Sequence, residues 1–321
     1  MKASRFLPLI GLAIFAYLLW SIDLGKLAAS FLSLDPLLFL AALGLSVVAI
    51  ALKAVKWQVI IRSYGLPFPF REALRGWLVG FAIGLVTPGK IGDFARAYYL
   101  KERANMGRAL TTVVVDRLAD ILILFLLAAI GLTAFVTLYV PNDLLLAGVY
   151  GFFVLFLAGL ALFSRTRVMI RVLRPFYRWF ISDARKGTVK AVFDDFYGGV
   201  AVMVGKKRLM LASLAITLLI WIVTIFYVWV LAVAMGLAVP YWFLFLTFPI
   251  VGLLFALPIS FSGLGTREAA LLFFLSYVGI GAEQAIAYSL LMLVVDYLLG
   301  AAGFALWTRH PIHLRVGKNN L

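Results

Sequence analysis

The sequence contains no cysteine, only two histidines and few charged residues. Without cysteine the chain can form no disulfide, thiol nucleophile or cysteine metal site. The two histidines, His310 and His313, both lie near the C-terminal end, which leaves no histidine for a base or a metal ligand in the rest of the chain. Charged residues make up 13% of the chain, whereas an ordinary soluble domain has about 25%.

Apolar residues dominate the composition. They make up 64% of the 321 residues, with a mean hydropathy of +1.07, and no soluble fold of this length could bury so much apolar surface. The apolar runs are continuous, not alternating, which excludes a membrane β-barrel. We therefore expect a single all-α integral membrane domain over 1–321. The predicted full spans are 6–22, 36–55, 110–138, 144–163, 209–235 and 284–307.

Two further apolar stretches, 76–86 and 243–257, are interrupted by proline and glycine and then resume. Non-helical backbone at membrane depth survives only where protein or a water-filled cavity surrounds it. We expect 76–100 and 243–280 to be re-entrant or broken helices, and the sequence does not decide between the two. Gly76, Gly80 and Gly84 form a ridge at four-residue spacing that indicates close helix packing.

The positive charge is concentrated in five segments, which hold 24 of the 29 lysines and arginines. By the positive-inside rule these segments are cytoplasmic, and both termini are then cytoplasmic as well. We expect the protein to lie in the cell membrane. The longest basic segment, 164–208, is predicted to form an amphipathic surface loop. The net charge of +15 therefore suits anionic lipid headgroups, not nucleic acid. The five segments are 1–10, 53–75, 101–108, 164–208 and 309–321.

The order of spans repeats with inverted orientation. Two spans, a broken segment and a third span occupy 1–140, starting in the cytoplasm, and the same series occupies 144–308, starting outside. The third spans share VVDRL (114–118) and VVDYL (294–298). An inverted repeat is the architecture of many secondary transporters.

Nine charged residues remain at membrane depth, where each costs about 2.5–3.5 kcal/mol. Asp296 lies near the middle of its span and needs a cationic partner, for which Arg267 or Arg96 is the natural candidate. A purely structural reading, in which the ion pairs only hold helices together, remains open for these residues. The nine are Lys90, Asp93, Arg96, Asp116, Arg117, Asp120, Arg267, Glu268 and Asp296.

Both interrupted segments offer an anion site. A short helix is expected to restart after Gly92 and after Gly265, and free amides at a helix N-terminus favour an anion such as phosphate. Thr87, Ser260 and Ser262 add hydroxyl donors. The candidate substrate-binding residues are Lys90, Arg96, Arg117, Arg267, Gly92, Gly265 and Thr266. The candidate organising or proton-relaying residues are Asp93, Asp116, Asp120, Glu268 and Asp296.

No nucleotide, cofactor or metal site is expected. The segment GLVTPGK resembles a phosphate-binding loop, but Ile91 stands where the magnesium-binding Ser or Thr would be.

The blocks TPGKIGDFAR, VVDRLAD and PISFSGLGTREA resemble the signature blocks of the lysylphosphatidylglycerol synthase transmembrane region family, also called flippase-like domain proteins. The resemblance covers essentially the whole chain. One family block falls on Pro88, Gly92, Asp93 and Arg96, with Asp in place of the usual Glu and a slightly shorter spacing to the Arg. Another falls on Asp116 and Arg117, again with Asp for Glu, and a third falls on Gly263, Leu264, Gly265, Arg267 and Glu268.

The resemblance implies a flippase that moves an anionic or modified phospholipid, or a polyprenyl-phosphate-linked lipid, across the cell membrane through a polar crevice. The family's synthetic activities are not expected here, because no soluble aminoacyltransferase domain follows residue 308 and no glycosyltransferase domain precedes residue 6. The chain is then not an enzyme, and its partners are the lipid, with a second copy or a lipid-modifying enzyme as candidates. The alternatives are a membrane-embedded transferase with Asp93 or Glu268 as general base, and a purely structural subunit.

Overall fold

The computed structural model describes residues 7–100, 104–163, 195–196, 198, 205–256 and 263–309, and these residues are almost entirely helical, without a β-strand. The expected all-α membrane fold is therefore found. The elements are α1 (Leu7–Trp20), α2 (Leu24–Leu32), α3 (Pro36–Arg62), α4 (Phe70–Val86), η2 (Pro88–Leu100), α5 (Met106–Tyr139), α6 (Asp143–Phe163), α9 (Lys207–Ala234), α10 (Tyr241–Ala256), α11 (Thr266–Ser276) and α12 (Ala282–Arg309).

Four of these helices, α3, α5, α9 and α12, are long and apolar enough to cross a membrane. A fifth span results if α1 and α2, which meet at an angle of 94°, count as one. The predicted span 6–22 therefore corresponds to α1, but the chain then turns into α2, a helix that the sequence did not predict. The predicted span 144–163 corresponds to α6, an apolar helix of 21 residues over Asp143–Phe163.

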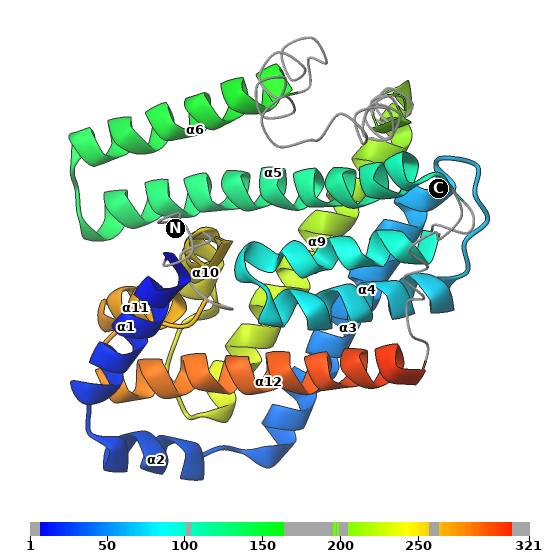
Figure 1. Cartoon of the computed structure of the whole chain (residues 1–321). Coiled ribbons are helices and arrows are strands. Elements are labelled where there is room, and N and C mark those ends of the chain that lie inside the picture. Colours follow the sequence, from blue (N-terminus) through cyan, green and yellow to red (C-terminus); the bar gives the residue numbers. More distant parts are fainter. Residues whose placement is uncertain are drawn as a thin grey trace.

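The long helices cross in the middle of the molecule. Helices α3 and α9 pack against each other along much of their length, and Figure 1 shows them running obliquely behind α4, α5 and α12. Helix α4 packs against α12, and α10 packs against α5, whereas α6 packs beside α5 at the periphery. The largest apolar core lies where α5 and α9 to α12 meet, and there the Tyr288 hydroxyl donates a hydrogen bond to the Val228 carbonyl at 2.5 Å.

Helix α4 and η2 form a hairpin. The packing is antiparallel, because an added Cβ at Gly80 would lie 3.3 Å from the Arg96 Cβ, and one at Gly84 would lie 2.8 Å from an Asp93 carboxylate oxygen. Gly92 lies directly against the backbone of Ile83. The two arms have nearly equal lengths of about 25 Å, by the rise of α- and 3₁₀-helices. The glycine ridge therefore packs as the sequence indicated.

The second interrupted segment is also folded back. Helix α11 packs against both α10 and α12, and Gly265, with φ of +84°, precedes its first turn. This helix restarts after Gly265 as expected. In the first segment the expectation needs correction, since η2 already begins at Pro88 and is a 3₁₀-helix. Most of the predicted loop 164–208, together with Ser260, Ser262 and the two histidines, lies outside the described residues.

Candidate functional site

Six charged side chains from α3, η2 and α5 form one network, which we call the α5 cluster. Asp116 lies at its centre, with one carboxylate oxygen 2.5 Å from Arg96 Nη2 and the other 2.9 Å from Lys56 Nζ. All three side chains are buried, with exposed fractions of 0 or 1%. The members of the α5 cluster are Lys56, Asp93, Arg96, Asp116, Arg117 and Asp120.

The outer part of the α5 cluster is partly exposed. Arg117 lies 2.6 Å from the Asp93 carboxylate and 3.6 Å from that of Asp120. The side chains of Arg117 and Asp120 are 30% and 27% exposed. Lys56 also pairs with Asp120 and so joins the buried and the exposed parts. A ligand could therefore reach Arg117 and Asp120, but not Asp116.

Arg96 is fixed from two sides. Its guanidinium lies over the Trp57 ring, 5.1 Å from the ring centroid, and the Trp57 indole donates a hydrogen bond to the Thr112 hydroxyl at 3.2 Å. Aromatic stacking and a buried carboxylate are the surroundings that a planar guanidinium favours. Arg96 therefore connects η2 to both α3 and α5.

A second network, the α11–α12 cluster, consists of Arg267, Glu268, Ser289 and Asp296. Arg267 Nε donates a hydrogen bond to the Ser289 hydroxyl at 2.8 Å, and this hydroxyl donates to Glu268 at 2.7 Å. Arg267 Nη1 lies 3.5 Å from an Asp296 carboxylate oxygen. Arg267 is thus the partner of Asp296 in this structure, as one of the two candidates proposed from the sequence.

Glu268 occupies a position that the sequence offered to an anion. Its second carboxylate oxygen accepts a hydrogen bond from the Gly265 amide at 2.6 Å, so the chain's own carboxylate caps α11. Thr266 donates to the Gly263 carbonyl at 3.1 Å. In the other segment the Thr87 hydroxyl accepts a hydrogen bond from the Gly92 amide at 2.8 Å. The side chain of Lys90 lies outside the described part of the structure.

Lys53 lies between the two clusters. Its ammonium group lies over the Trp77 ring, 5.1 Å from the centroid, and interacts electrostatically with both Asp120 and Asp296. Sequence reasoning missed Lys53 and Lys56 because it counted both lysines in the cytoplasmic segment 53–75, although Lys53 also lies within the predicted span 36–55. Helix α3 continues to Arg62, so both lysines belong to the helix. Their spacing of three residues on an apolar helix was the available signal.

Among the described side chains, the two clusters and Lys53 bring together five cations and five carboxylates, so their formal charges balance. Several guanidinium nitrogens nevertheless lack a hydrogen bond although they are buried, namely Arg96 Nε and Nη1, Arg117 Nε, and Arg267 Nη2. A buried donor without a partner carries an energetic cost of about 1–3 kcal/mol or more. Of the three arginines that carry these nitrogens, only Arg117 is partly exposed, at 30%, whereas Arg96 and Arg267 are buried.

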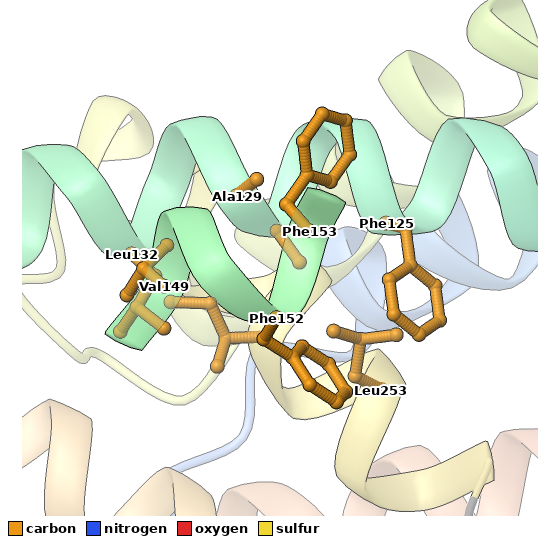
Figure 2. Close-up of a pocket in the computed structure, with 9 residues that line it drawn as sticks. Phe125, Ala129, Leu132, Val149, Phe152, Phe153 and Leu253 are labelled. Atoms are coloured by element: carbon orange, nitrogen blue, oxygen red, sulfur yellow. The ribbon is translucent and has the colours of Figure 1, made fainter. Parts of the chain in front are cut away.

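An apolar cavity lies apart from the clusters, between α5, α6 and α10 (Figure 2). Its volume is about 50 Å³, and it is only partly enclosed. Its walls are entirely hydrocarbon, from Phe125, Ala128, Ala129, Leu132, Val149, Phe152, Phe153, Ile250 and Leu253.

Comparisons with known proteins agree with the motifs. The family model described as "Lysylphosphatidylglycerol synthase TM region" matches residues 9–303. A UPF0104 membrane protein of Methanothermobacter thermautotrophicus is 25% identical over 93% of each chain. The UPF0104 membrane protein MJ1595 of Methanocaldococcus jannaschii is 25% identical over 90% of this chain and 88% of its own length.

The chain is also similar to part of a larger protein. The glycosyltransferase AglD of Haloferax volcanii is 27% identical over 75% of this chain, and the match covers 43% of its own length. No solved structure matches the chain.

Proposed function

The chain belongs to the lysylphosphatidylglycerol synthase TM region family, and from this premise we propose that it moves the headgroup of an anionic or modified phospholipid across the cell membrane. The single observation that carries the proposal is the set of ten charged side chains gathered at the crossing of α3, η2, α5, α11 and α12. So many ionisable groups in a chain this apolar are expensive in a bilayer and typically mark a substrate or ion pathway.

The accessible members of this set define the proposed path. Arg117, Asp120 and Asp296 are each about a quarter to a third exposed, whereas Asp116 is buried. Arg117 and Arg267 would bind the phosphate through buried nitrogens that now make no hydrogen bond, once a movement of the helices exposes them. Asp296, about 20 Å from either end of α12 by helical rise, would hold Arg267 when no lipid is bound.

An inverted repeat would supply the two alternating states. Helix α4 packs against α12 as α10 packs against α5, and α3 and α9 pack against each other. In the first half an arginine of the returning arm, Arg96, pairs with Asp116, and in the second half Arg267 pairs with Asp296. These parallel contacts support a two-fold relation between the halves, and rocking one half against the other is how many such transporters work.

The test is lipid translocation in proteoliposomes. Phospholipids with a chain-bound fluorophore and different headgroups are reconstituted with the purified chain, and a membrane-impermeant quencher reports their arrival in the outer leaflet. We expect the wild type to accelerate quenching for at least one headgroup. Asp296→Asn should slow this translocation about tenfold, which corresponds to an increase of about 1.4 kcal/mol in the activation free energy of translocation.

Asp143→Asn provides the matched control, since it removes the same charge at the exposed start of α6, and it should leave the rate unchanged. Equal effects of both substitutions would overturn the role of Asp296. Failure to accelerate translocation of any phospholipid would overturn the proposed function.

The transferase alternative uses the same residues differently. Asp93 and Glu268, its candidate bases, are held by Arg117 and by the Gly265 amide, which favours a structural role for both carboxylates. Transfer of a labelled group to a lipid phosphate by the purified chain, with loss of transfer in Asp93→Asn or Glu268→Gln, would favour the transferase.

A further inference from the structure

One face of α5 leads from the charges to the apolar cavity. Arg117, Ile121, Phe125, Ala128 and Leu132 follow one another at intervals of three or four residues and so lie along the same side of the helix. The stripe begins with a partly exposed guanidinium, continues over an exposed isoleucine, and ends in the wall of the cavity.

The cavity is suited to hydrocarbon and unsuited to water. A water molecule needs two to four polar partners, and every residue that lines the cavity is apolar. Figure 2 shows the ring of Phe125 on α5 and that of Phe152 on α6 at the same side of the cavity, with Leu253 of α10 between them. Phe125 and Phe156 stack with their ring centroids 3.7 Å apart, which holds α6 in place beside α5.

The distance along α5 matches the length of a lipid chain. From Arg117 to Ala128 the helix rises about 16 Å, and the hydrocarbon layer of one leaflet is about 15 Å thick, half of the bilayer core. A lipid whose headgroup lies at Arg117 would place the end of its chain in the cavity. A volume of about 50 Å³ suits the last few carbons of a chain and not a whole chain.

We propose that the cavity between α5, α6 and α10 binds the terminal part of one acyl chain of a phospholipid whose headgroup is held at Arg117. The proposal rests on the proposed function in taking a phospholipid as the ligand, and it adds a site for the chain. The cavity would hold the end of one acyl chain beside α5 while the headgroup moves from one charged side chain to another.

The test is photocrosslinking of the full chain in nanodiscs. Two phosphatidylglycerol probes are compared, one with a diazirine at the end of an acyl chain and one with a diazirine next to the glycerol. We expect the terminal probe to label residues of the cavity wall, and the other probe to label α5 near Ile121. Ala129→Leu fills the cavity. It should reduce labelling by the terminal probe about fourfold for each methylene of the acyl chain that the leucine side chain displaces.

The matched control is Ala134→Leu, the same change on a residue of α5 that does not line the cavity. Equal labelling in both variants would overturn the proposal, as would labelling of the wall by both probes alike. A third probe, a polyprenyl phosphate with a terminal diazirine, is tested beside the two phospholipids. Preferred labelling by this probe would also overturn the proposal, because the ligand would then be an isoprenoid.

The translocation assay separates this proposal from the proposed function. Labelling of the cavity without any translocation supports the chain site and overturns the function. Translocation that is unchanged in Ala129→Leu, together with absence of labelling, overturns the chain site alone.

Discussion

Asp116 and Asp296 lie in the similar segments VVDRL and VVDYL but have different surroundings. Asp116 is buried and faces two cations at 2.5 and 2.9 Å, whereas Asp296 is 28% exposed and lies 3.5 Å from one cation. A close, desolvated pair resists separation, and a longer, partly hydrated pair exchanges partners more readily. We infer that Asp116 mainly holds the fold and that Asp296 is the residue that changes partner.

This difference predicts that Asp116→Asn lowers the stability of the protein. Asp116→Asn removes the counter-charge of Lys56 and Arg96, which are both buried, and removing one partner from a buried pair costs about 3–5 kcal/mol. We expect a large drop in the thermal unfolding temperature of the detergent-solubilised protein.

The comparison is Asp143→Asn, which removes the same charge from an exposed position at the start of α6 and should change the unfolding temperature little. A drop of similar size in both variants would show that Asp116 has no special structural role.

The candidate site was predicted from the sequence in part. Charged residues at membrane depth are rare enough to stand out, and so the pairing of Arg267 with Asp296 could be anticipated from the position of Asp296 within its span. Lys56 could not be separated from a cytoplasmic loop by counting charges. Only the structure shows that α3 carries this lysine to two carboxylates of α5.

At the scale of elements, polar residues caused the main differences between expectation and structure. Asp23 and Lys26 indicated a loop, but the Asp23 carboxylate accepts hydrogen bonds from the Gly25 and Lys26 amides and thereby starts α2. The apolar pattern predicted the long helices correctly because each must satisfy its backbone internally in a membrane. The pattern indicated the glycine ridge of α4, but it could not predict that η2 is a 3₁₀-helix, because repeats of about 3.0 and 3.6 residues differ little over 13 residues.

The hairpin of α4 and η2 depends on small residues. A Cβ at Gly92 would collide with the backbone of Ile83, which cannot move as a flexible side chain could. We expect Gly92→Ala to separate the two arms and to destabilise the protein by about 1–3 kcal/mol or more, as overpacking does, measured as a lower unfolding temperature.

Gly148→Ala on α6 is the control, because a Cβ there meets nothing within 4 Å and alanine favours the helix. An unchanged unfolding temperature in Gly92→Ala would show that Gly92 does not lie against the Ile83 backbone.

At the scale of the whole molecule, the fold and the orientation are separate questions. The packing pairs of helices are the same for either orientation in the membrane, and the distribution of lysine and arginine alone predicts which side is cytoplasmic. The hairpin of α4 and η2 bears on both the fold and the orientation. If α4 enters the membrane and η2 returns, the chain segments before α4 and after η2 must lie on the same side.

Single cysteines can test this arrangement directly, because the natural chain has none. Pro67→Cys precedes α4, Asn105→Cys follows η2, and Asn142→Cys joins α5 to α6; all three positions are exposed. In sealed vesicles of known orientation, a membrane-impermeant maleimide should label Pro67→Cys and Asn105→Cys from the cytoplasmic side alone and Asn142→Cys from the opposite side. Labelling of Pro67→Cys and Asn105→Cys from opposite sides would mean that the α4–η2 segment spans the membrane, and the inverted repeat proposed for the two halves would then fail. Labelling of all three with the sides reversed would leave the repeat intact and overturn only the predicted orientation.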